Sequence, residues 1–182
     1  HQYIRTGQID SKFGFALETG EALEAAVAAE KSPNLELDGL HCHIGSQIFE
    51  TEPFAHAPEV MLGFLHDLRA RFGRELRVLN LGGGFGIRYT GADAPLPCED
   101  YVEALAASLK ASCARLGMAV PFVCIEPGRS IVGAAGVTLY TVGSVKEIPG
   151  VRTYAAVDGG MTDNPRYALY QSAYTVMTAN RM

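Results

Sequence analysis

The stretch that decides the fold is RVLNLGGGFG, at residues 77–86. Its first half, 77–81, is a short apolar run typical of a buried strand. Its second half begins with three glycines, Gly82 to Gly84, which let backbone N–H groups approach an anion closely because no Cβ atom intervenes. The pattern matches neither the G-x-G-x-x-G dinucleotide fingerprint nor the Gly-Lys-Ser/Thr of nucleoside triphosphate sites. A phosphate-binding loop and a tight turn without a ligand both remain open.

Helices and strands alternate on both sides of this stretch. Apolar residues recur with a helical period over 53–72, and Gly73 follows directly as a stop signal. The other predicted elements are helices at 21–31 and 99–116, a strand within 34–44 and a strand at 122–126. Such alternation predicts an α/β fold with a parallel sheet, either an open sandwich or a barrel.

The pattern changes after Gly133. Residues 136–148 and 152–157 alternate apolar and polar side chains with a period of two, and no long helix separates them. Consecutive strands without a crossover predict antiparallel pairing. Residues 174–177 are also β-like. We therefore expect a domain boundary near 133–136.

Composition and charge restrict the class of protein. The chain has 182 residues, of which 48% are hydrophobic, and a formal net charge of -5. These values predict a globular fold and disfavour nucleic acid or anionic lipid as a partner. No apolar stretch reaches the ~18 residues of a membrane span. The four cysteines never approach Cys-x-x-Cys spacing, so we expect reduced thiols and a cytoplasmic location. Neither end resembles a domain terminus, so we expect a piece of a longer enzyme.

Two histidines, His41 and His43, stand two residues apart on the predicted strand, so both imidazoles share one face. Three interpretations are open: a metal pair of a hydrolase, ordinary core histidines, or an imidazole lying flat on an aromatic cofactor. A zinc site needs a third ligand, and the other histidines fall at the terminus or on a helix, which weakens the metal interpretation. These are His1, His56 and His66.

A carboxylate closes the strand at 122–126. Glu126 is expected to be poorly solvated there and to need a partner. With Arg129 three residues on, one interpretation is a structural ion pair. The other is a carboxylate aimed at a ring nitrogen, with the arginine available for a ligand anion.

A short helix is predicted near the end of the chain. Asp163 or Asn164 is suited to cap it, and Pro165 suits its first turn. Arg166 and Tyr170 then lie one turn apart on the same face. A guanidinium and a phenol placed side by side form a clamp for a carboxylate.

Four motifs in order resemble one family: HIGSQ at 43–47, NLGGGFG at 80–86, EPGR at 126–129 and DGGMTDNPR-x-x-LY at 158–170. The family comprises the pyridoxal-phosphate-dependent decarboxylases built on an alanine-racemase-like barrel. Within it, the last motif is more similar to diaminopimelate decarboxylases than to ornithine or arginine decarboxylases. The resemblance extends over essentially the whole chain, from TGQIDSKFGF onward.

The resemblance implies pyridoxal 5′-phosphate as cofactor and meso-2,6-diaminopimelate as substrate, decarboxylated to L-lysine and CO₂. It implies that Glu126 keeps the pyridine nitrogen protonated and that His43 stacks on the ring. Ser46 and Gly84 would hold the phosphate. The implied cofactor-binding set is His43, Ser46, Gly83, Gly84, Glu126, Pro127, Gly128 and Arg129. The implied substrate-binding set is Arg129, Arg166 and Tyr170.

The resemblance also implies an incomplete architecture. Residues 1–133 would be the second half of a (β/α)₈ TIM-like barrel, and 134–182 the start of a mostly antiparallel β-domain. The family's Schiff-base lysine and proton-donating cysteine match no position here, and Lys12 resembles a different segment. We therefore expect no catalytic residue and no metal in this chain, which would be inactive alone. The full-length protein would be a homodimer with shared active sites.

Three alternatives remain beside this interpretation. The chain could belong to another amino-acid decarboxylase of the ornithine or arginine type. It could be a non-catalytic relative that acts as a binding partner. It could also be a metal-dependent hydrolase that uses His41 and His43.

Overall fold

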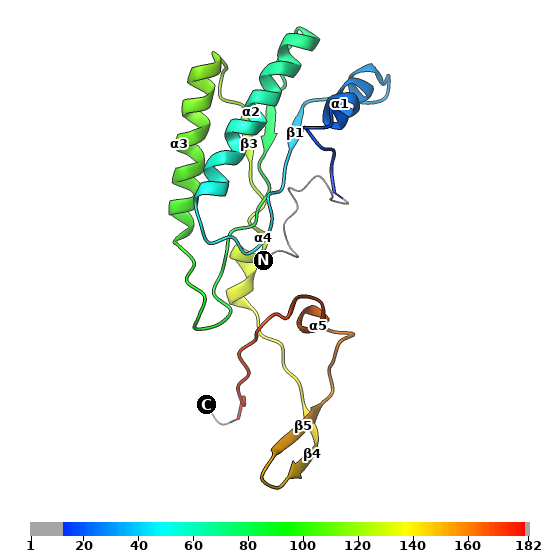
Figure 1. The fold of residues 1–182 in the computed structure, drawn as a ribbon, viewed down its shortest axis with the longest axis vertical. Helices are drawn as coiled ribbons and strands as arrows, with labels where there is room; N and C mark the ends of the chain where they lie inside the picture. Colours follow the sequence, from blue (N-terminus) through cyan, green and yellow to red (C-terminus); the bar gives the residue numbers. More distant parts are fainter. Residues whose placement is uncertain (1–12, 181–182) are drawn as a thin grey trace.

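The first part of the chain folds into a three-stranded parallel sheet (Figure 1), as the computed structural model of residues 13–180 shows. The strands are β1 (Gly39–His41), β2 (Val78–Asn80) and β3 (Phe122–Cys124), and they lie side by side in chain order. A helix connects each strand to the next. The α/β arrangement expected from the sequence is therefore confirmed.

Three long helices accompany these strands: α1 (Glu21–Lys31), α2 (Glu52–Phe72) and α3 (Cys98–Leu116). Each agrees with its predicted range to within one residue. Helices α2 and α3 end at Gly73 and Gly117, whose φ angles of +68° and +61° lie in the left-handed region that glycine adopts most readily. No helix within the described residues is long and apolar enough to cross a membrane.

Helices α2 and α3 pack against one face of the sheet through a single apolar core. Leu62, Leu65 and Leu68 recur along α2 at a spacing of three and are at most 1% exposed. Leu79, at the centre of β2, is fully buried in the same cluster. Because burial of each leucine contributes roughly 1.5–3 kcal/mol, this core fixes the sheet against its helices.

The opposite face of the sheet carries polar side chains at the carboxyl ends of β1 and β2. Successive residues of a strand point to opposite faces, so Asn80 projects away from the core that its neighbour Leu79 enters. The register aligns Asn80 with His41 on one side and with Cys124 on the other. These three residues form one row across the sheet, at the carboxyl ends of the strands.

Three aromatic rings form a second, smaller apolar core. The rings of Phe54 and Phe85 stack with centroids 4.7 Å apart, and Tyr101 tilts against both. The Tyr101 hydroxyl donates to the carbonyl of Phe49 at 3.0 Å and accepts from the N–H of Leu96 at 3.1 Å. These contacts attach the segments that follow β1 and β2 to the helices.

After β3 the sheet gives way to shorter elements. These are α4 (Gly128–Val132), the 3-10 turn η2 (Gly133–Ala135), β4 (Val142–Ile148) and β5 (Arg152–Val157). The predicted antiparallel pairing of β4 with β5 is confirmed. Helix α4 is not among the predicted elements, because a proline followed by glycine at 127–128 indicates a bend, yet proline also fits a helix start.

Two strands predicted after residue 133 differ from the structure. The strand expected from residue 136 begins only at Val142, and its register shifts between Val142 and Val145. Residues 174–177, which are β-like in sequence, form no strand, since no neighbouring strand among residues 13–180 pairs with them. The predicted short helix is present as α5 (Arg166–Tyr170).

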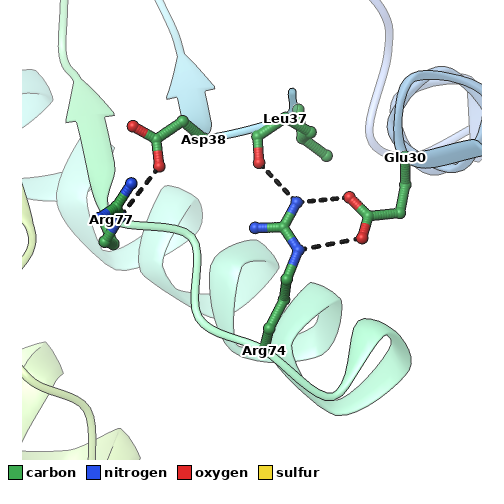
Figure 2. A network of polar contacts seen from close by, with 5 residues as sticks. All are labelled: Glu30, Leu37, Asp38, Arg74 and Arg77. Carbon is green, nitrogen blue, oxygen red and sulfur yellow. Dashed lines mark hydrogen bonds and ion pairs between the residues drawn. The ribbon is translucent and has the colours of Figure 1, made fainter. Parts of the chain in front are cut away.

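An arginine network fastens the amino-terminal end of the sheet (Figure 2). Arg74, just after α2, donates through Nε to Glu30 of α1 at 3.0 Å, through Nη2 to the other oxygen of that carboxylate, and to the carbonyl of Leu37 at 2.7 Å. Beside it, Arg77 donates to Asp38 at 3.2 Å. The network joins α1, the segment before β1 and the segment before β2. The Arg74 guanidinium holds the pKa of Glu30 below its usual range.

This pair predicts a pH-dependent stability. A carboxyl whose pKa is lowered by folding contributes stability above its unfolded pKa of about 4.3, and loses it as the pH falls through the folded pKa. Glu30→Gln should therefore lower the unfolding midpoint at neutral pH, and its difference from the wild type should vanish in acid. Thermal unfolding across pH measures this. Glu24→Gln, on the same helix, is the control and should show no such pH-dependent difference.

Candidate functional site

Three loops meet at the carboxyl ends of the strands. We call them the β1 loop (42–49), the glycine loop (81–87) and the β3 loop (125–127). The N–H of Ile48 donates to the carbonyl of Gly84 at 3.0 Å, and the N–H of Gly86 donates back to Ile48 at 2.9 Å. The N–H of Glu126 donates to the carbonyl of Gly82 at 2.6 Å. The glycine loop is therefore bonded to both of its neighbours.

The glycine loop has no room for side chains at its centre. A Cβ atom on Gly83 would lie 2.0 Å from the carbonyl oxygen of Glu126, well inside van der Waals contact. Gly84 has a φ of +104°, and a Cβ there would lie 2.5 Å from the carbonyl oxygen of Gly45. The glycines are required because the backbones of three loops touch here.

The side chain of Gln47 clasps the β1 loop to the glycine loop. Its Nε2 donates to the carbonyl of Ile87 at 2.6 Å, and its Oε1 accepts from the N–H of the same residue at 3.2 Å. Gln47 has a φ of +60°, a conformation that non-glycine residues rarely adopt. The sequence does not reveal this role, because residue type alone does not indicate a contact between distant segments.

His43 lies beyond the end of β1 rather than within it, which corrects the placement of both histidines on one strand. Its Nδ1 accepts a hydrogen bond of 3.3 Å from the N–H of Gly83. Because a backbone N–H can only donate, Nδ1 is the acceptor and the proton of the neutral ring is on Nε2. The imidazole is thus oriented by the glycine loop.

Glu126 is placed differently from expectation. Strand β3 ends at Cys124, so the Glu126 side chain lies beyond the sheet and is 57% exposed rather than poorly solvated. Its partner is Asn80, whose Nδ2 donates to Oε1 at 2.8 Å. The other oxygen lies 3.9 Å from His41 Nε2. No ion pair joins Glu126 to Arg129 within residues 13–180, so the structural pair is not formed.

The β1 loop and the glycine loop contain donors with no acceptor of their own. Among residues 13–180, neither the hydroxyl of Ser46 nor the N–H of Gly84 donates to another group. Two donors on adjacent loops, one a backbone N–H in a glycine turn, suit an anion such as phosphate. A carboxylate and an oriented imidazole lie at the same edge, which suits a protonated aromatic ring.

The remaining EPGR residues form the start of α4. Pro127 caps this helix, and Gly128 is its first residue. The guanidinium carbon of Arg129 lies 5.7 Å from the centroid of the Tyr89 ring, in the range of a cation–π contact. This contact directs Arg129 toward the segment that follows the glycine loop.

The predicted carboxylate clamp lies on α5. Arg166 and Tyr170 are both exposed at its two ends, and the Arg166 N–H donates to Asn164 Oδ1 at 3.2 Å, so Asn164 contributes to the cap. Within residues 13–180, no hydrogen bond or ion pair joins either clamp residue to Arg129. Their joint action on a substrate anion stays a prediction.

The described residues at this edge of the sheet support neither a metal site nor a reactive cysteine. Among the described residues, no group of three histidine, cysteine or acidic side chains is placed to hold a metal ion. His1 and Lys12 lie outside the described residues. Cys42 is partly buried against the leucine core, and this burial raises the pKa of its thiol to about 11, which disfavours the nucleophilic thiolate.

Residues 1–133 match the family described as "Pyridoxal-dependent decarboxylase, pyridoxal binding domain". The chain belongs to this family. The cofactor expected from the motifs is confirmed at the level of the family, and the oriented imidazole, the carboxylate and the two donors described above fit pyridoxal phosphate.

Several similar proteins are named diaminopimelate decarboxylase. The chain is 53% identical over 182 residues to the diaminopimelate decarboxylase of Bacillus subtilis and spans 42% of that protein's length. The crystal structure of the enzyme from M. jannaschii in co-complex with L-lysine is 33% identical, with a TM-score of 0.81 over 96% of this chain and 39% of that one. The lysine/ornithine decarboxylase of Vibrio vulnificus, 22% identical with a TM-score of 0.76, shares the fold alone.

The Gln47 clasp predicts a measurable loss of stability. Gln47→Ala removes two hydrogen bonds and leaves the Ile87 N–H and carbonyl unpaired, so we expect a loss of about 1–3 kcal/mol in the free energy of unfolding. Gln171→Ala is the matched control, because Gln171 shares the positive φ at +52° but is exposed. Denaturant unfolding of the purified protein compares the two. Equal losses for both variants would contradict the clasp.

Proposed function

We propose that the full-length protein decarboxylates meso-2,6-diaminopimelate to L-lysine and CO₂ with pyridoxal 5′-phosphate. The observation that carries the proposal is the convergence of His43, Ser46, Gly84 and Glu126 at one edge of the sheet. The names of the relatives, at up to 53% identity, support the substrate. The lysine/ornithine decarboxylase of Vibrio vulnificus, at 22% identity, shares only the fold with this chain.

Each residue has a physical task in this proposal. Ser46 and Gly84 would donate to the phosphate, together with the backbone of residues 126–129. His43, whose ring is oriented by Gly83, would stack on the pyridine ring. Glu126 would accept a hydrogen bond from the ring nitrogen and keep that nitrogen protonated. When bound, pyridoxal phosphate supplies an electron sink for the pair left behind when CO₂ departs.

The architecture of the whole protein is part of the proposal. Residues 1–133 form the second half of a (β/α)₈ barrel, and 134–182 begin a β-domain. The lysine that binds the cofactor covalently and the cysteine that donates a proton belong to parts outside this chain, which is then inactive alone. The full-length protein is, in this proposal, a cytoplasmic homodimer whose two subunits share their active sites. The exposed apolar side chains of the β4–β5 hairpin support a larger β-domain.

Substrate choice rests on the second carboxylate of diaminopimelate. Arg166 and Tyr170, with Arg129, bind that carboxylate. An arginine beside the distal group attracts an anion and repels the bare ammonium of ornithine, so it discriminates in both directions.

The first test compares three substrates. Steady-state kinetics of the full-length wild type, followed by CO₂ release, should give a kcat/KM for diaminopimelate far above those for ornithine and arginine. Efficient turnover of ornithine would replace the substrate assignment with another amino-acid decarboxylase. A wild type that binds pyridoxal phosphate and turns over none of the three would support the non-catalytic relative.

The second test addresses the clamp. Arg166→Ala should raise KM for diaminopimelate at least ~10-fold, because a charge-assisted hydrogen bond is worth roughly 1.5–3 kcal/mol. Its affinity for pyridoxal phosphate should change little. Arg152→Ala, on the hairpin beside Tyr154, is the control and should leave both values unchanged. An Arg166→Ala variant that loses cofactor but keeps its KM would place this residue at the cofactor instead.

A further inference from the structure

The side-chain amide of Asn80 bridges two parts of the site. Its Oδ1 accepts from the N–H of Gly82 at 2.9 Å, and its Nδ2 donates to Oε1 of Glu126 at 2.8 Å. One end of the amide therefore touches the glycine loop and the other touches the carboxylate. No sequence motif assigns a role to the side chain of Asn80.

The orientation of this amide is dictated by chemistry. A backbone N–H can only donate, so the amide oxygen must face Gly82. The NH₂ group is then left facing Glu126, whose carboxylate can accept. Asn80 is the residue type that satisfies both neighbours, since aspartate has no donor for the carboxylate and leucine has no polar atom.

Within residues 13–180, Asn80 provides the main restraint on the Glu126 side chain. The side chain lies past the end of β3 and is 57% exposed. Within residues 13–180, its only hydrogen bond is the one from Asn80, and the approach of His41 Nε2 to the other oxygen is 3.9 Å. Without Asn80, a glutamate with several rotatable bonds is free to leave the position from which it accepts a ring proton.

We propose that Asn80 is the positioning residue of Glu126: by bridging Gly82 and one carboxylate oxygen, it fixes that carboxylate toward a cationic ring nitrogen and leaves the other oxygen available to the ligand. The inference rests on the proposed function, since the ligand is pyridoxal phosphate. Preorganising an acceptor in this way strengthens binding by removing the cost of ordering it on association.

The decisive variant is Asn80→Asp in the full-length protein. It keeps the acceptor for Gly82 and nearly the same shape, but it sets a carboxylate against Glu126. Titration with pyridoxal phosphate, followed by its absorbance, should show at least ~10-fold weaker affinity. The thermal midpoint without cofactor should stay close to that of the wild type. Asn34→Asp, at an exposed position in the turn after α1, adds the same charge and should bind normally.

Repeating the Asn80→Asp substitution in a second variant distinguishes positioning of Glu126 from a role of Asn80 in the glycine turn alone. In a Glu126→Gln protein, the glutamine amide can donate to the new aspartate, so Asn80→Asp should weaken affinity little further. A similar loss in both backgrounds would overturn the inference, because Asn80 would then act independently of Glu126. Wild-type affinity in Asn80→Asp, with a lowered midpoint in Asn80→Ala, would also overturn it and assign Asn80 to the turn alone.

The same measurements distinguish failure of the inference from failure of the proposed function. A wild type that binds no pyridoxal phosphate contradicts both. A wild type that binds it but does not decarboxylate diaminopimelate overturns only the substrate, and the Asn80 comparison still decides the positioning role.

Discussion

The contact of backbone with backbone at Gly83 is the constraint on which the site depends. The glycine loop and the β3 loop approach so closely that a single added Cβ would lie 2.0 Å from the Glu126 carbonyl oxygen. That approach sets the distance between the second and third strand ends. It also aims the Gly83 N–H at His43 and brings Glu126 within reach of Asn80. A larger residue at position 83 would therefore move the Gly83 N–H away from His43 and Glu126 away from Asn80.

The helices of this chain are well predicted because their signals are local. Apolar spacing and a following glycine give both ends of α2 and α3 to within one residue. The ends of the strands, in contrast, depend on pairing with segments that are distant in the sequence. The β-like sequence continues past His41 and past Cys124, but pairing stops there because the chain turns into loops that touch across the sheet. Residues 174–177 show the same limit, since a strand needs a neighbour.

The residues of the functional site show the same difference between local motifs and long-range contacts. Ser46, Gly84, His43 and Glu126 follow from motifs, and the structure brings them to one edge. The solvation of Glu126 was wrongly predicted, because it assumed a strand that reached this residue. Gln47 and Asn80 were missed, although the register of β1 with β2 places Asn80 beside His41. Their tasks depend on which backbone group lies opposite, and sequence spacing carries no such information.

The burial of Cys42 has a consequence for oxidative chemistry. Two imidazoles flank this thiol in the sequence, an arrangement that would favour a reactive thiolate on an open surface. Here the side chain packs into the leucine core, and its pKa of about 11 leaves roughly one thiolate in ten thousand at neutral pH. Peroxides and electrophiles act on thiolates, so they should attack the exposed Cys98 long before Cys42. The segment that carries His41 and His43 is therefore protected from oxidation at the cysteine between them.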